Sequence, residues 1–499
     1  MTDLLLRHKR AGDWEAATAT LWWAAEQHAP TLRALHANMV LSTLAAAKPT
    51  AEWERACALL EQMPSMGLRR DPYSYSSTIA ACSRAGQPEC ALTIFRQCSA
   101  EAEEDARPNG VIFNAMLLAC QRAGPTWQPQ LLAIFTAMGT HGVTPDAWAY
   151  SVALNAHAQT RQWRKALELL DVMELRSVRD PAGARPDSHC YGAAMRACLQ
   201  SSEPERVAAL HERMVAAGVP RSAYTLVPLL DSHAAVARKG DHAAWRPAKA
   251  ALDAAAAEDM ALNVLCYSAA ARAYAECGRY EEALQLLPAM RARQPPVLPN
   301  AHVFTAIISS FGPSRQSQRA LTLLRGMRER GVAVDAHCVE AALKVVGRAG
   351  AWRDACALLR TMRVQLGVSP TPIHLTTALQ CVGAAGEWDE AAALLEDVLG
   401  RHALAVDARL AEAALRVCAH SGSWQRALAL LDDAGNTATP PMRRAAALAL
   451  GRAGEWRRAQ ELLDRLAAVD GDAGRRDPAM VKLAALVAEK VANDADAYA

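Results

Sequence analysis

Apolar residues along the chain recur with the spacing of one helix face. In the segment "WRDACALLRTM", Leu358, Leu359 and Met362 lie three, four and seven residues after Ala355. This spacing predicts an amphipathic helix. The preceding segment, "AHCVEAALKVVGRAG", predicts another helix that ends at Gly350, because glycine readily adopts the left-handed conformation of a helix C-cap. Together the two segments predict a pair of helices joined by a short turn.

Nearly the same phrase returns along the chain, as "RAGAWRDACALLRTM" at residues 348–362, "RAGEWRRAQELLDRL" at 452–466 and "RAGDWEAATATLWW" at 10–23. The position three residues after the tryptophan, or after the residue in its place, marks each repeat. The markers are Ala17, Ala56, Ala91, Gln130, Ala166, Val207, Ala248, Ala283, Ala320, Ala355, Ala391, Ala427 and Ala459. Consecutive markers are most often 35 or 36 residues apart. Because one helical hairpin cannot bury its apolar face alone, such a period predicts stacked hairpins. We expect an all-α fold, an α-solenoid superhelix of about 13 helix-turn-helix repeats of about 35 residues.

Tryptophan begins the second helix of nine repeats, and Tyr280 takes its place in a tenth. The nine are Trp14, Trp53, Trp127, Trp163, Trp245, Trp352, Trp388, Trp424 and Trp456. We interpret them as wedges between the two helices of a pair, since the small marker residue that follows lets the helices approach closely. A row of exposed stacking platforms is the alternative interpretation.

Composition narrows the functional classes. The net charge is +2, so any nucleic-acid binding needs a local basic stripe and not a global excess. The 13 cysteines are scattered without a C-x-x-C pair, which indicates reduced thiols. Four of them recur at one place in the first helices and are expected to be packing residues, not zinc ligands: Cys82, Cys120, Cys198 and Cys418. The sequence contains no P-loop, no deaminase signature and no membrane-length apolar run. We therefore expect no enzymatic activity, no cofactor and no metal site.

The repeats divide the chain into three expected segments. Residues 1–35 form an incomplete or irregular repeat, residues 36–470 the tandem helical hairpins, and residues 471–499 a capping helix and tail. Such a cap is expected where an array ends. No Arg- and Ser-rich presequence precedes the first repeat, so the protein has no targeting segment or this chain lacks it.

The residues between hairpins distinguish this array from tetratricopeptide repeats of similar length. Repeats close with Pro-Asp or Pro-Asn, followed by an aromatic residue and a short polar one, as in "TPDAWAYSVAL" and "RPNGVIFNAML". A methionine often stands seven residues, once eight, after the marker, as at Met173 and Met362. In these features the chain resembles a pentatricopeptide repeat (PPR) protein with a P-type array, in particular the Ala-rich, Trp-marked members of unicellular algae.

The resemblance implies a function. Proteins of this family bind single-stranded RNA by modular repeats in chloroplasts or mitochondria, and act there in mRNA processing, stability or translation. It implies single-stranded RNA as the partner, together with other RNA-processing proteins. We expect a monomer without membrane attachment. A tetratricopeptide-like protein-interaction scaffold without RNA binding is the alternative.

In the family, two polar residues per repeat read one base, one in the first helix and one at the close of the repeat. The positions that match are Ser76 with Asn109 and Ser268 with Asn300, which favour A; Asn114 with Asp146, which favours U; and Ser151 with Asp187, Thr305 with Asp335 and Thr376 with Asp407, which favour G. Four repeats give no base: Gly192 with Ser222, Val227 with Asn263, Glu340 with Thr371 and Glu412 with Thr439. The first two repeats and the last are too irregular to align. The resemblance thus implies a preference near 5′-A-U-G-N-N-A-G-N-G-3′.

The family also places side chains on either side of each base and basic residues near the phosphates. The stacking positions that match are Tyr73, Val111, Trp148, His189, Tyr224, Leu265, His302, His337 and Ile373, with Arg409 departing from the pattern. The phosphate positions are Arg84, Arg122 and Arg348, together with Arg10 and Arg452. Inter-repeat packing and completion of the helix dipole are the alternative roles for these two sets.

Overall fold

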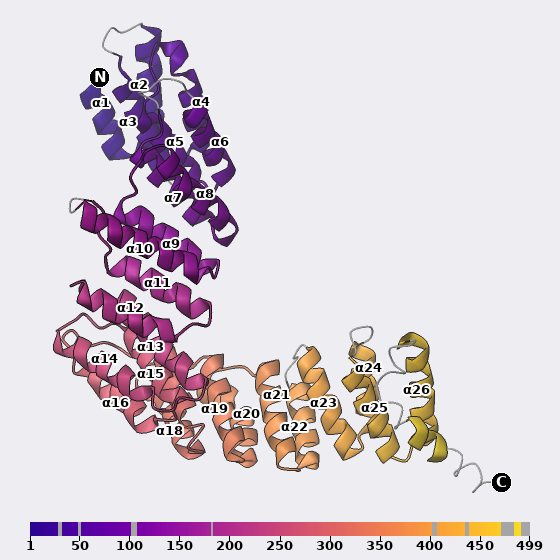
Figure 1. Ribbon diagram of the computed structural model, residues 1–499. Coiled ribbons are helices and arrows are strands. Elements are labelled where there is room, and N and C mark those ends of the chain that lie inside the picture. Colours follow the sequence, from indigo (N-terminus) through magenta and orange to yellow (C-terminus); the bar gives the residue numbers. More distant parts are fainter. Residues whose placement is uncertain are drawn as a thin grey trace. The chain divides into compact units, whose positions relative to one another are not determined.

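A computed structural model describes residues 1–27, 32–47, 51–100, 107–180, 183–401, 407–434, 439–470 and 484–490, and no strand occurs among them (Figure 1). The first helices of the repeats are α1 (Thr2–Ala11), α3 (Ala34–Ala46), α5 (Pro72–Arg84), α7 (Gly110–Ala123), α9 (Ala147–Gln159), α11 (Ser188–Gln200), α13 (Ala223–Arg238), α15 (Val264–Glu276), α17 (Ala301–Ser310), α19 (Ala336–Ala349), α21 (Pro372–Ala384), α23 (Ala408–Ser421) and α25 (Pro440–Arg452). The second helices are α2 (Trp14–Glu26), α4 (Trp53–Gln62), α6 (Pro88–Ala100), α8 (Gln128–Thr140), α10 (Trp163–Arg179), α12 (Glu205–Ala216), α14 (Trp245–Ala257), α16 (Tyr280–Arg291), α18 (Ser317–Glu329), α20 (Trp352–Leu366), α22 (Trp388–Arg401), α24 (Trp424–Ala434) and α26 (Trp456–Asp470). These thirteen pairs of the described chain confirm the predicted α-solenoid architecture and repeat number.

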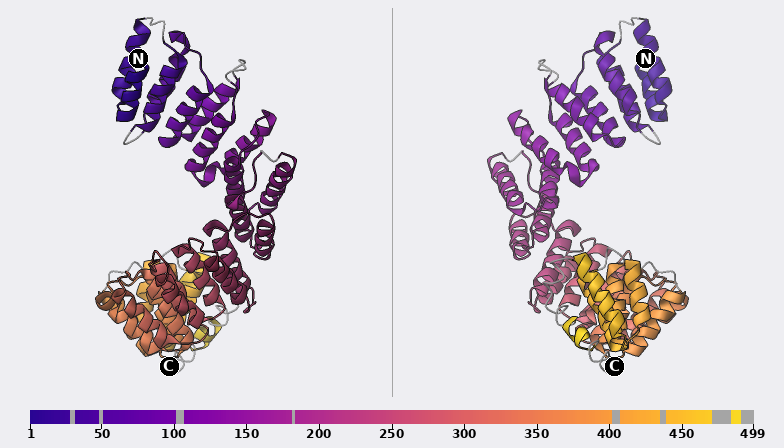
Figure 2. Two further views of the ribbon diagram at one scale, coloured as in Figure 1. Left: turned by 90° about the vertical axis from the view of Figure 1, so that its left-hand side faces the viewer. Right: turned by 90° about the vertical axis from the view of Figure 1, so that its right-hand side faces the viewer.

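The chain forms two compact parts. The N-terminal part comprises Met1–Ser232 and Asp259–Ala261, and the C-terminal part His233–Glu258 and Leu262–Ala499. From α1 to α11 and from α15 to α25, each first helix packs against its own second helix and neighbouring first helices pack against each other, as α3 does on α5 and α5 on α7 (Figure 2). Each part therefore presents a layer of successive first helices, in which equivalent positions recur from repeat to repeat.

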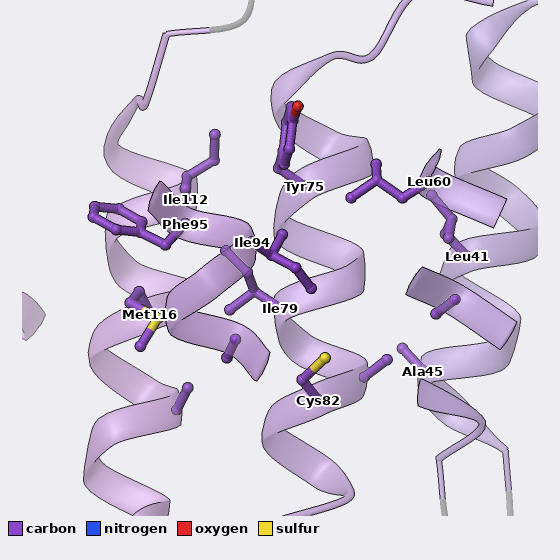
Figure 3. Close-up of a cluster of buried hydrophobic side chains, with 14 of the residues drawn as sticks. Leu41, Ala45, Leu60, Tyr75, Ile79, Cys82, Ile94, Phe95, Ile112 and Met116 are labelled. Atoms are coloured by element: carbon purple, nitrogen blue, oxygen red, sulfur yellow. The ribbon is translucent and has the colours of Figure 1, made fainter. Parts of the chain in front are cut away.

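The core runs continuously between neighbouring repeats. In the first repeats Leu41, Ile79 and Met116 point inward from α3, α5 and α7, and meet Leu60 of α4 and Ile94 of α6 (Figure 3). Twelve of the thirteen predicted markers, all except Gln130, are at most 1% exposed. The small markers let second helices approach first helices closely, as the repeated phrase predicts. The four recurring cysteines also lie buried in this packing.

The fourth marker is wrong by one residue. Trp127 lies in a 3₁₀ turn, η3 (Pro125–Trp127), and α8 begins only at Gln128. The extra turn residue moves the apolar face forward, so that Leu131 is buried and Gln130 is exposed. Met138 then stands seven residues after the marker, as a methionine does in six other repeats.

The tryptophans are wedges that remain half-buried. The ring of Trp388 lies against Gly383 of its own first helix, and that of Trp456 lies against Gly451. Their outer faces are covered by the next repeat in several places. Arg55 lies over Trp14 at 4.1 Å from the ring centroid, and Arg206 lies over Trp163 at 4.2 Å. Cation–π contacts of this kind stabilise by about 0.5–1 kcal/mol at exposed sites.

Of the expected capping segment, the structure describes residues 484–490, which are helical. Val487 is fully buried there against Ala447 and Leu450 of α25 and Ala459 of α26. The other residues of that segment, 471–483 and 491–499, lie outside the described part of the chain. No helix in the described ranges is long and apolar enough to span a membrane.

Candidate functional site

The predicted stacking residues occupy one structural position. Counting from N1, the first helical residue, each of them is residue N2 of a first helix, from Tyr73 in α5 to Ile373 in α21. All of them are exposed, for example Tyr73 at 64%, Leu265 at 63% and Trp148 at 40%. Six of these nine residues carry large apolar or aromatic side chains, and the other three are histidines. The row therefore presents a recurring surface for flat or apolar groups.

The predicted base-reading residues occupy two further positions beside this row. The first member of each pair is N5 of a first helix, and the second member is the N-cap of the first helix in the next repeat. The N-cap residues are Asn109, Asp146, Asp187, Asn300, Asp335 and Asp407, and each accepts hydrogen bonds from backbone amides of its own helix. These side chains thus stabilise helix starts, by about 1 kcal/mol each, whatever else they bind.

The structure joins one predicted pair directly. Asn114 Nδ2 donates to Asp146 Oδ2 at 2.9 Å, while Asp146 Oδ1 accepts from the backbone amide of Ala149 at 2.7 Å. Both carboxylate oxygens are therefore oriented. The Asn114 side-chain carbonyl oxygen is buried and has no hydrogen-bond partner in the described structure. The second Asn114 amide hydrogen and the remaining lone pairs of the Asp146 carboxylate are not used by these two bonds.

The hydroxyl members of the other pairs bond to their own helices. Thr305 Oγ1 donates to Ala301 O at 2.9 Å, Thr376 Oγ1 to Pro372 O at 2.8 Å, and Ser268 Oγ to Val264 O at 2.8 Å. Ser268 is only 4% exposed, and Ser76 is also buried and donates to Tyr73 O at 3.2 Å. In the pairs of Ser76, Ser268 and Thr376 the N-cap side chain is the more accessible member. Ser151 is half-buried at the same N5 position.

One pair was missed from the sequence. Asn38 is residue N5 of α3 and Asp71 is the N-cap of α5, and Asn38 Nδ2 lies 3.0 and 2.8 Å from the two Asp71 carboxylate oxygens. Ser74 Oγ donates to the Asn38 side-chain carbonyl at 2.7 Å. The second repeat is therefore regular and carries the same amide–carboxylate contact as Asn114 and Asp146. The missed signal is the segment "RRDPYSYS", where aspartate precedes proline instead of following it.

Gly192 has a packing role at its N5 position. A Cβ atom there would lie 2.6 Å from the backbone oxygen of Tyr224, so α11 and the start of α13 approach too closely for any side chain. The rings of His189 and Tyr224, two consecutive N2 residues, are 4.2 Å apart between centroids. The predicted stacking residues of this repeat therefore contact each other.

The basic positions differ in their surroundings. Arg84 Nη1 donates to the backbone oxygen of Ala45 at 2.8 Å, in the last turn of the preceding first helix α3. The Arg348 guanidinium lies against Gly312, just after α17. Arg122 is exposed at the end of α7. The contact of Arg84 favours completion of a helix end for this residue.

Comparison with known sequences identifies the repeat. The family profile described as PPR repeat matches residues 73–99, 148–178, 265–294 and 302–332, and each match begins at an N2 residue. The chain is 32% identical over 157 residues to the chloroplastic pentatricopeptide repeat-containing protein 10 of Zea mays. The aligned residues make up 31% of this chain and 19% of that protein. It is 21% identical over 310 residues to a putative pentatricopeptide repeat-containing protein of Arabidopsis thaliana, covering 60% and 56% of the two. A mitochondrial relative from the same plant is 22% identical over 318 residues, covering 63% and 44%.

Among solved structures, the superposition on maize PPR10 includes 99% of this chain and 78% of the PPR10 chain, with 18% identity and a TM-score of 0.49. The complex of PPR10 with an 18-nt psaJ RNA element gives 21% identity and a TM-score of 0.41, covering 98% and 66%. The matched regions span between about a fifth and just over half of the length of the curated relatives named above.

Proposed function

Because the chain is a pentatricopeptide repeat protein, we propose that it binds single-stranded RNA with sequence selectivity through the N2, N5 and N-cap residues of its first helices. The observation that carries the proposal is the recurrence of one arrangement: an exposed N2 side chain, a polar N5 side chain and a polar N-cap side chain beside it. Helix capping alone accounts for the polar N-cap residues, whereas a protein-interaction scaffold has no reason to keep a short polar residue at N5 beside them.

The arrangement suits an unstacked nucleotide. Exposed N2 residues of consecutive repeats offer their faces to a base, and stacking on aromatic or apolar side chains is tolerant of sequence. The N5 and N-cap side chains then meet the Watson–Crick edge, which only single strands expose. At Asn114 and Asp146, the second amide hydrogen and the carboxylate match the carbonyl acceptor and the N3–H donor of uracil.

The repeat of α3 lengthens the preferred RNA by one nucleotide. Asn38 and Asp71 form the same amide–carboxylate pair, so this repeat takes uracil by the same matching of donors and acceptors. The preference becomes 5′-U-A-U-G-N-N-A-G-N-G-3′. At Gly192 we expect a repeat that takes no base, because its N2 rings are in contact and its N5 position is filled.

The protein would act by occupancy and without catalysis of its own. A bound array shields an RNA segment from nucleases or keeps it from pairing, which alters RNA processing, stability or translation. Relatives named chloroplastic and mitochondrial support an organelle as the place of action. Phosphate attraction contributes modestly, since the net charge is only +2.

Trp148→Ala tests the proposal directly. The ring is 40% exposed, so its removal affects binding more than folding. We expect the affinity for a labelled single-stranded RNA carrying the motif to fall about tenfold, because stacking on one base contributes about 1–3 kcal/mol. Fluorescence anisotropy measures the change, and Val178→Ala, at an 80% exposed position on the second helix α10, is the matched control. Equal RNA affinity of both variants and the unaltered protein would show that the N2 residues do not contact the RNA.

A further inference from the structure

Two repeats of the C-terminal part carry a glutamate at N5, where the repeats of α15, α17 and α21 carry Ser268, Thr305 and Thr376. Glu340 lies in α19 and Glu412 in α23. Each is paired with a basic residue at N9 of the same helix. Lys344 Nζ is 2.7 Å from Glu340 Oε1, and Arg416 Nη2 is 3.1 Å from Glu412 Oε1. The same acid–base unit therefore stands at the reading position of two repeats.

Both units face one hollow on the layer of first helices. The hollow has a volume of about 390 Å³ and also contains the reading pair Thr376 and Asp407. Ile373 and Arg409, the consecutive N2 residues, lie at its walls. Its volume is within the range of about 300–1,000 Å³ usual for small-ligand sites. The hollow is thus the place where the N2, N5 and N-cap positions of neighbouring repeats converge.

The charges of the hollow are balanced. Its lining contains three acidic side chains, Glu340, Asp407 and Glu412, and three basic ones, Lys344, Arg409 and Arg416. With no net charge, the hollow has no bias toward a phosphate group. It offers instead alternating acceptors and donors, which suits the edge of an uncharged base.

Among the four bases, one edge matches a carboxylate beside a cation. Guanine presents two adjacent donors, N1–H and N2–H₂, next to one acceptor, O6. A carboxylate accepts both donors with its two oxygens, as it does from the fork of arginine. Adenine and cytosine place a ring-nitrogen lone pair beside their single amino group, and uracil flanks its one N–H with two carbonyls. Each of these three would set a lone pair against the carboxylate.

We propose that Glu340 and Glu412 each read a guanine, accepting N1–H and N2–H₂, while Lys344 or Arg416 donates to O6. This inference rests on the proposed function and assigns bases to two repeats that the family pattern leaves open. Lys344 also fixes the state of its partner: its hydrogen bond and charge hold the pKa of Glu340 below the ordinary value. At neutral pH the Glu340 side chain is therefore an acceptor only.

The assignment changes the expected RNA. Thr305 with Asp335 and Thr376 with Asp407 already favour guanine, so α17, α19, α21 and α23 form four consecutive guanine-reading repeats. The 3′ end of the preferred sequence becomes A-G-G-G-G. The preference derived from the family pattern alone, which assigns no base to the two glutamate repeats, contains no such run of guanines.

Selection from a random single-stranded RNA pool, followed by sequencing, tests the inference with the full chain. The unaltered protein should enrich guanine at both nucleotides. In Glu340→Gln, one acceptor becomes a donor, so guanine at the α19 nucleotide should lose about tenfold in preference. Adenine should rise there, since its N6–H₂ donor and N1 acceptor match a side-chain amide. Glu412→Gln should act in the same way two nucleotides toward the 3′ end.

Glu390→Gln is the matched control, because Glu390 lies on the second helix α22 and pairs there with Arg360 at 3.3 Å. It should leave every base frequency unchanged. An enriched motif without guanine at the two positions, or an unchanged motif in both glutamate variants, would overturn the inference while RNA binding stands. Failure to enrich any RNA would overturn the proposed function and the inference together.

Discussion

At the scale of single residues, the N-cap position that we propose for base reading is defined by helix capping. Asp146 already accepts from the Ala149 amide, and the N-cap side chains of α5, α7, α11, α15, α17, α19, α21 and α23 accept in the same way from their own helices. Ser222 Oγ before α13 and Thr439 Oγ1 before α25 have no hydrogen-bond partner in the described structure. This dual role explains why the position holds only aspartate, asparagine, serine or threonine across the repeats from α5 to α25. Capping fixes the side chain in place, so base reading adds no ordering cost there. Because helix capping restricts this position to a few residue types, the position could be recognised in the sequence.

Asn114→Thr tests the reading role of one residue. A threonine hydroxyl at N5 bonds to its own helix, as Thr305 and Thr376 do, and would release Asp146 Oδ2. The pair then has the same residue types as Thr305 with Asp335. We therefore expect the preferred base at the nucleotide of the α7 repeat, the second uracil of U-A-U-G, to change from uracil to guanine. Anisotropy with RNAs that differ only at that nucleotide should show about a tenfold reversal. Retained binding with an unchanged preference would show that Asn114 does not read the base.

The sequence could predict the proposed stacking and reading positions from α5 onward because they recur at the repeat period, and a Pro-Asp or Pro-Asn turn precedes α7, α9, α11 and α17. It could not predict Asn38, since the order of aspartate and proline is reversed before α5. Nor could it predict the reason for Gly192, which depends on the distance between two helices. The contact of Arg84 with Ala45 is also tertiary, because the two residues lie 39 positions apart.

At the scale of helices, the pairs follow from apolar periodicity and glycine caps. Gly350, for example, has a φ of 71° at the end of α19, as its sequence position predicts. The one displaced marker results from the 3₁₀ turn that precedes α8, and apolar periodicity alone does not predict such a turn. Close approach of α11 and α13 is the main departure from a uniform layer. It places a packing residue, Gly192, at the N5 position of α11.

Gly192→Ala tests that close approach. Alanine favours a helix over glycine by about 1 kcal/mol, yet its Cβ would lie 2.6 Å from the Tyr224 oxygen. We expect the clash to prevail and to lower the free energy of unfolding by about 1–3 kcal/mol. Gly139→Ala in α8 is the control, because no atom lies within 4 Å of its added Cβ. Thermal unfolding followed by circular dichroism should show a lower midpoint for Gly192→Ala alone, and an equal or higher midpoint would exclude the close contact.

At the scale of the whole molecule, the repeat period predicted the architecture. Thirteen markers in the sequence correspond to thirteen helix pairs in the described chain, and twelve are correct to the residue. The proposed function is distributed along this array, with one polar N5 and N-cap pair in most repeats from α3 to α21. A neutral overall charge is consistent with selectivity that depends on bases more than on phosphates.

The most direct test of this account is the motif that the unaltered protein selects from a random pool of single-stranded RNA. The account predicts enrichment of U-A-U-G, followed after two unspecified nucleotides by A-G and a guanine-rich 3′ end. Sequencing of the bound fraction measures both the order and the spacing of these bases. Recovery of no motif, with no RNA bound even at low salt, would contradict the central claim and favour a protein-interaction scaffold.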